Sequence, residues 1–177
     1  MFMKKVAFII MLGTLPLLIS SFSEPRSEKI KWLSLAQLKA AYAKQPRPVL
    51  VDVYTDWCGW CKVMDRETYT NDKLADYINK NYYAVKFNAE STSAVEFGSK
   101  KYNFNEANRV HDLAVYLLGG QMGYPTTVFL AGPDAQPAPL PGFMRPSQME
   151  APLKYFGDGA YKNKNYPEFM ATFTAKW

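Results

Sequence analysis

Histidine and cysteine, the residues that most often bind zinc, are scarce in this chain. It has one histidine, His111, and two cysteines, Cys58 and Cys61, among 177 residues. C-x-x-C spacing is half of many zinc sites, but no second half follows, and no pattern brings His111 close to the cysteines. The sequence therefore favours no metal site. His111 borders an apolar helical stripe and is expected to have a packing role.

Dense clusters of basic residues are also missing. The formal net charge is +5, and the closest groupings are Lys100-Lys101 and the Lys162/Lys164 pair. A charge this small and dispersed argues against nucleic-acid binding and is typical of a solvated surface. The sequence has no heptad or repeated interface pattern either, so a monomer is expected.

After Ser23 the chain has no apolar run of the roughly 20 residues that cross a bilayer. Before it, Lys4 and Lys5 precede an apolar run over Val6–Ile19, and residues 21–23 (SFS) suit a signal peptidase. We predict a signal peptide over residues 1–23 and an exported protein, periplasmic or extracellular after cleavage near Ser23. An uncleaved membrane anchor is the alternative, although the run is short for a span.

The two cysteines are three positions apart. Exported proteins enter compartments where structural disulfides persist. A bridge that closes so short a loop restricts the unfolded chain rather little, however. The Cys58–Cys61 pair is therefore better explained by its reactivity than by a structural role.

The apolar pattern predicts alternating helices and strands in a single α/β domain. The run Val49–Tyr54 is β-branched and apolar, as in a buried central strand. Pro152 lies inside a helical pattern, so that helix either begins near it or is kinked. We expect helices over residues 34–44, 62–69, 105–118 and 147–156, a helix capped by Asn71, a last helix from Pro167 to Trp177, and strands over residues 49–54, 82–87, 126–131 and 138–143.

Cys58 comes directly after the predicted central strand and at the start of a helix. Unpaired N–H groups and the positive end of the helix dipole stabilise a thiolate at such a position. Cys61, one turn further on, can attack a mixed disulfide and release the product. Gly59 is expected to let the turn close tightly, and Trp57 and Trp60 to shield the sulfurs.

Two segments carry a resemblance to the thioredoxin family. Residues 51–62 (VDVYTDWCGWCK) look like its active-site segment, and residues 123–130 (GYPTTVFL) look like its cis-proline strand. The resemblance covers roughly residues 36–156. It implies a thioredoxin fold over residues 24–177: a central mixed β-sheet flanked by helices on both faces, a helical insertion before the cis-proline strand, and a C-terminal helical extension over residues 157–177.

The resemblance also implies roles for individual residues. Cys58 and Cys61 match the catalytic pair. Asp52 matches the family's buried acid, which assists proton transfer at the second cysteine, and Lys86 matches its lysine partner. A buried carboxylate beside a lysine is expected to have a perturbed pKa.

Substrate binding is expected at the cis proline. The family's pattern implies that Pro125 is cis and that the Tyr124 backbone is free to pair with an extended segment. Gly142 matches the small residue that leaves room beside the site. Trp57, Gly59 and Trp60 complete the predicted substrate-binding set.

Two departures from thioredoxin itself stand out. Trp60 stands where thioredoxin has a proline, so the reducing behaviour of thioredoxin cannot be assumed for this chain. The stretch over residues 88–123 is also longer than in a minimal thioredoxin. The run over residues 57–68 is more similar to exported thioredoxin-like proteins of bacteria.

The function that this resemblance implies is thiol–disulfide exchange. We expect a reductase of disulfides in exported proteins, supplied with electrons by a membrane or periplasmic donor. Its redox group would be the Cys58–Cys61 disulfide, with no further cofactor. A disulfide oxidase or isomerase, and a binding module with an incidental disulfide, are the alternatives.

Overall fold

A five-stranded mixed sheet forms the centre of the molecule. The computed structural model describes residues 29–177, so the predicted signal peptide lies outside the described residues. The strand order is β1-β3-β2-β8-β9; β1, β2 and β3 run parallel, and β8 and β9 are antiparallel to their neighbours. The strands of this sheet are β1 (Trp32–Leu33), β2 (Val49–Tyr54), β3 (Tyr83–Asn88), β8 (Thr126–Leu130) and β9 (Ala138–Pro141).

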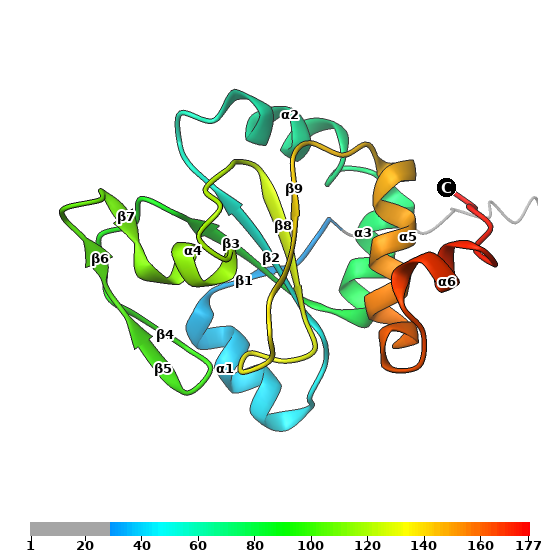
Figure 1. Cartoon of the computed structure of the whole chain (residues 1–177), viewed down its shortest axis with the longest axis horizontal. Coiled ribbons are helices and arrows are strands. Elements are labelled where there is room, and N and C mark those ends of the chain that lie inside the picture. Colours follow the sequence, from blue (N-terminus) through cyan, green and yellow to red (C-terminus); the bar gives the residue numbers. More distant parts are fainter. Residues whose placement is uncertain (1–28) are drawn as a thin grey trace, which may run out of the picture.

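Helices cover both faces of the sheet, which confirms the predicted thioredoxin fold (Figure 1). In β2, Val51 packs against α1 and α4, whereas Leu50 points to the opposite face, where α2, α3 and α5 pack. This alternation is the one that a pleated strand imposes on successive side chains. The helices are α1 (Leu35–Lys44), α2 (Gly59–Glu67), α3 (Asp72–Asn81), α4 (Asp112–Leu117), α5 (Pro146–Gly157) and α6 (Tyr166–Met170), with a 3₁₀ turn, η1, over Ala160–Lys162.

Two helices begin directly after their capping residues. Ser34 and Gln37 form a reciprocal capping box on α1, and the side chain of Asn71 accepts the Leu74 N–H at the start of α3. The helix with the internal Pro152 begins at Pro146 and continues through it. At the start of the described residues, Ile30 is buried and β1 pairs with β3 at the edge of the sheet.

The predicted helical insertion is wrong in its first part. Two hairpins precede the short helix α4, so the expected helix over residues 105–118 begins only at Asp112. Arg109 has a φ of 52°, which breaks a helix, and the buried His111 pairs with Phe104 in the second hairpin. The His111 ring then accepts the Leu113 N–H and thereby starts α4. The hairpins are β4 (Val95–Phe97) with β5 (Lys100–Tyr102), and β6 (Phe104–Asn105) with β7 (Val110–His111).

The predicted last helix is wrong beyond Met170. The chain leaves α6 and returns to α5, where the buried carboxylate of Glu150 accepts the Lys176 and Trp177 N–H groups at 2.7 and 2.9 Å. The Trp177 ring packs on Tyr77 of α3 at 5.6 Å between centroids. These contacts require an extended end rather than a continued helix. Within residues 29–177, no helix is both long and apolar enough to span a membrane.

Candidate active site

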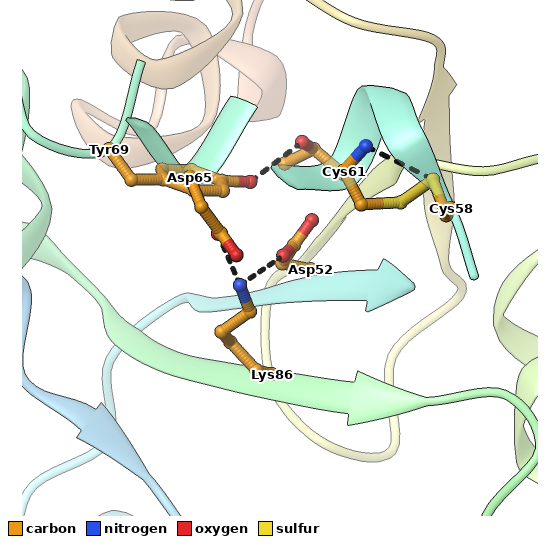
Figure 2. A network of polar contacts seen from close by, with 7 residues as sticks. Asp52, Cys58, Cys61, Asp65, Tyr69 and Lys86 are labelled. Atoms are coloured by element: carbon orange, nitrogen blue, oxygen red, sulfur yellow. Dashed lines mark hydrogen bonds and ion pairs between the residues drawn. A yellow bond between two sulfur atoms is a disulfide. The ribbon is translucent and has the colours of Figure 1, made fainter. Parts of the chain in front are cut away.

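The two cysteines lie where β2 ends and α2 begins (Figure 2). Cys58 is the N-cap of α2; its sulfur accepts the Cys61 backbone N–H at 3.0 Å, and a disulfide joins the two residues. Each cysteine is about 4% exposed. The N–H groups of the first helical turn and the helix dipole stabilise a negative charge on Cys58 when the bridge is reduced.

Exposed tryptophans flank the disulfide on both sides. Trp57 and Trp60 are 67% and 62% exposed. The Trp57 indole N–H donates to the Glu90 carboxylate at 2.9 Å, and its ring meets Tyr124 edge to face. Trp60 packs against Phe143 at 5.5 Å between centroids. Both rings therefore present apolar surface to a partner.

Gly59 does not have the role expected of it in closing a tight turn. It is the first residue of α2, its φ is not positive, and a Cβ at this position would meet no atom within 4 Å. The turn would therefore accept a side chain. The missing side chain instead leaves open space next to the disulfide.

Asp52 and Lys86 face each other across β2 and β3. They are register partners, and the Lys86 ammonium lies 3.3 Å from Oδ2 of Asp52, which is 2% exposed. The other oxygen, Oδ1, has no hydrogen-bond partner among residues 29–177 and points toward Cys61 (Figure 2). Burial raises the pKa of Asp52 from 3.8 to about 6, with Lys86 opposing the shift and the negative charge of Asp65 adding to it.

Asp65 is a member of this site that the sequence prediction missed. Its side chain is 47% exposed, but its carboxylate pairs with the Lys86 ammonium, so Lys86 bridges two acids (Figure 2). A signal existed: Asp65 lies four residues after Cys61 and therefore on the same side of the helix. The ammonium also lies 5.1 Å from the Tyr54 ring centre and 5.8 Å from that of Tyr69.

Tyr69 is the second missed residue. It is buried, and its hydroxyl lies 3.3 Å from Oγ1 of Thr127 on β8. Burial is the main reason that the pKa of Tyr69 lies above its ordinary value, and the charge of Asp52 adds to the effect. At neutral pH it is a neutral hydroxyl in the wall around Asp52.

The Tyr124–Pro125 peptide bond is cis, and it lies beside the tryptophans. The Pro125 carbonyl accepts the Gly142 N–H at 2.8 Å, and Gly142 has a φ of 95°. A groove of about 280 Å³ runs between Trp60, Phe143 and this proline. No hydrogen bond within residues 29–177 uses the Tyr124 backbone, so both of its polar groups are available.

His111 is not part of the site. Its side chain is buried, with Nδ1 accepting the Leu113 N–H and Nε2 lying 3.2 Å from the Ser93 carbonyl. Burial lowers the pKa of His111. In the part of the chain that the structure describes, no three or more histidine, cysteine and acidic side chains are grouped to hold a metal ion.

This arrangement supplies the parts that dithiol–disulfide exchange needs. A nucleophilic sulfur at a helix N-terminus, a second sulfur within bonding distance and a buried carboxylate with a pKa near neutrality lie together. A free backbone next to the sulfurs can hold an extended substrate.

Comparison with known proteins gives one family match. Residues 19–154 match the family model Thioredox_DsbH, described as a protein of unknown function, DUF255. The thiol:disulfide interchange protein DsbD of Pectobacterium atrosepticum is 28% identical over 125 residues, which are 70% of this chain and 19% of that protein. The chain thus spans about a fifth of the length of this relative.

Solved structures show the same fold. The DsbH oxidoreductase superimposes with a TM-score of 0.52 at 15% identity, over 89% of this chain and 96% of that one. A thioredoxin from Thermus thermophilus superimposes with a TM-score of 0.54 at 15% identity, over 78% of this chain and 98% of that one.

Proposed function

The chain belongs to the Thioredox_DsbH family, and from this premise we propose that it is a thiol–disulfide oxidoreductase that reduces disulfides of exported proteins. The observation that carries the proposal is the buried Asp52 carboxylate, whose Oδ1 points toward Cys61 and has no hydrogen-bond partner in the described part of the chain. A purely structural disulfide has no use for a buried base.

The reducing cycle begins with the Cys58 thiolate. It attacks one sulfur of the substrate disulfide, forms a mixed disulfide and expels the other sulfur as a thiolate, which takes a proton from water. The Asp52 carboxylate then accepts the proton of the Cys61 thiol. The Cys61 thiolate attacks Cys58, re-forms the Cys58–Cys61 bond and releases the second substrate thiolate, so two electrons pass to the substrate.

Lys86 holds Asp52 in its ionised, proton-accepting form. Its ammonium opposes the rise in the pKa of Asp52 that burial causes. Without it the carboxyl would stay protonated to a higher pH and could not accept the Cys61 proton.

The substrate lies across Tyr124 in the proposed complex. The N–H and C=O of Tyr124, which form no hydrogen bond with residues 29–177, pair with an extended segment as an added strand does. Trp57 and Trp60 contact this substrate segment on either side. Because Gly59 has no side chain, the sulfur of the substrate can reach Cys58.

Export to the periplasm, or to the extracellular space, and a membrane or periplasmic electron donor are parts of the same proposal. The predicted signal peptide over residues 1–23 supports them. The name of the DsbD relative, a thiol:disulfide interchange protein, is in keeping with such a chain of exchanges.

The redox potential of the Cys58–Cys61 pair tests the proposed direction. The full chain is equilibrated in glutathione buffers, and the reduced and oxidised forms are quantified. A value near about −270 mV is expected for a reductase, whereas one between about −180 and −120 mV would make the protein an oxidant or isomerase.

Trapping with cysteine variants tests the chemistry itself. Cys61→Ser is expected to accumulate a mixed disulfide with a model disulfide substrate, and Cys58→Ser to form none. If the wild-type pair exchanges with no disulfide, the protein is a binding module instead.

A further inference from the structure

A second pocket lies on the Trp57 side of the disulfide. Its volume is about 410 Å³, and it is bounded by Trp57 and Tyr124 from the active site. The rest of its wall includes Arg109, Val115 and Met122 of the segment between β3 and β8. The insertion therefore forms a pocket that touches the site where a substrate segment is proposed to lie.

The wall of this pocket is held firmly against the end of β3. In the β6–β7 hairpin, the His111 N–H donates to the Ala89 carbonyl at 2.8 Å, and the Asp112 N–H donates to the Asn103 carbonyl at 2.9 Å. The buried His111 ring adds its contact with Ser93. A pocket held in this way needs little ordering when a partner binds.

Arg109 occupies a backbone position that disfavours it. Its φ of 52° is the only positive value among the non-glycine residues 29–177. Glycine or asparagine would adopt this conformation more easily. An arginine at such a position is best explained by what its side chain does.

The charges in the pocket differ in their partners. The Glu90 carboxylate accepts the Trp57 indole N–H, whereas Arg109 forms no ion pair within residues 29–177. Arg109 is exposed and lines this pocket together with Met122, which is 43% exposed. An arginine beside apolar surface matches a carboxylate on a short apolar stem.

We propose that this pocket selects substrate segments that carry a glutamate or aspartate side chain close to the reacting cysteine, and that Arg109 binds the carboxylate. The inference rests on the proposed function and adds a substrate preference to it. Arg109 is then a specificity-determining residue, contributed by the insertion rather than by the thioredoxin core.

A matched pair of peptides tests this proposal. Each has blocked ends and one cysteine as its methyl disulfide, with either Glu or Gln at the second residue before and the second after the cysteine. The second-order rate constant for reduction by the full, reduced protein is measured by stopped-flow tryptophan fluorescence. We expect the Glu peptide to react about fivefold faster at low salt, and the ratio to fall toward one at high salt.

Three variants identify the source of the preference. Arg109→Gln and Arg109→Gly should bring the ratio close to one. Glycine adopts a positive φ readily, so misfolding cannot explain a loss of the preference in the glycine variant. Arg66→Gln is the matched control, because Arg66 is an exposed arginine of α2 that pairs with Glu67 outside the pocket. It should keep the ratio. A wild-type ratio of one, or equal loss in Arg66→Gln, would overturn the proposal.

The same experiment separates this proposal from the function on which it rests. Measurable reduction of the Gln peptide supports the reductase whatever the ratio is. If neither peptide reacts, the pocket is tested by binding instead. The binding of the thiol forms of both peptides to Cys58→Ser is then measured by tryptophan fluorescence. Tighter binding of the Glu peptide that Arg109→Gln abolishes supports the pocket, and equal binding refutes it.

Discussion

The carboxyl group of Asp52 is buried near the disulfide, and its charged form is only partly stabilised by the surrounding residues. Lys86 pairs with one of its oxygens, and the other has no hydrogen bond among residues 29–177. Lys86 in turn is shared with Asp65. The carboxyl is therefore poised between its charged and neutral forms, which suits proton transfer and lowers the stability of the fold.

Asp52→Asn is expected to stabilise the oxidised protein by up to about 3 kcal/mol at pH 8 and by less than about 1 kcal/mol at pH 4. The folded pKa of about 6 exceeds the ordinary 3.8, so the wild type loses stability as the pH rises from about 4 through 6. The asparagine variant has no charge to bury and does not lose it. Urea unfolding at both pH values measures the difference.

Asp76→Asn, on the exposed side of α3, is the matched control and should change little at either pH. Equal stabilisation by Asp52→Asn at both pH values would assign the effect to packing rather than to charge.

Two elements far apart in the sequence meet at Gly98. This glycine forms the β4–β5 turn with a φ of 60°, and it packs against the turn after β8. A Cβ there would lie 2.9 Å from the Pro133 carbonyl oxygen and would also clash with the Asp134 side chain, which accepts the Ser99 N–H. The absent side chain allows the hairpin to dock.

Gly98→Ala is expected to lower the free energy of unfolding by about 2 to 3 kcal/mol, because the positive φ and the close contact both oppose a side chain. Gly119→Ala is the control, since its φ of 61° is similar but its surroundings are open. We expect a loss of about 1 kcal/mol there. Urea unfolding compares the two, and equal losses would mean that the docking contact contributes nothing.

At the scale of the whole molecule, the C-terminal segment packs back onto α5. Glu150 is fully buried on α5. Its carboxylate pairs with the Lys154 ammonium of the same helix and accepts hydrogen bonds from the Lys176 and Trp177 N–H groups. Burial acts to raise the pKa of Glu150, but these hydrogen bonds outweigh it, and the pKa lies below its ordinary value. The contribution of Glu150 to stability is therefore present at neutral pH and is lost as the pH falls through that lowered value.

Glu150→Gln and removal of residues 172–177 should each lower the free energy of unfolding at pH 7, by about 2 kcal/mol. Because both changes break the same contacts, their combination should be less than additive by at least about 1 kcal/mol. Urea unfolding of the four proteins measures this coupling. Strict additivity would mean that Glu150 does not hold the C-terminal end.

Local pattern and motif spacing alone determined much of this protein. The buried strand β2, the helix α1 and the position of Cys58 at the start of α2 could be predicted, because each depends on neighbouring residues. The Asp52–Lys86 pairing could be predicted as well, because the resemblance implied it residue by residue.

Only the tertiary structure decided the rest, since it depends on residues that are distant in the sequence. Asp65 enters the site through Lys86, 21 positions away, and the C-terminal end is held by Glu150 rather than continuing as a helix. Periodicity over residues 105–118 favoured a helix, but the pairing of β6 with β7 and the burial of His111 prevailed. The pocket at Arg109 exists for the same reason: its walls come from several segments, and no local pattern records how these meet.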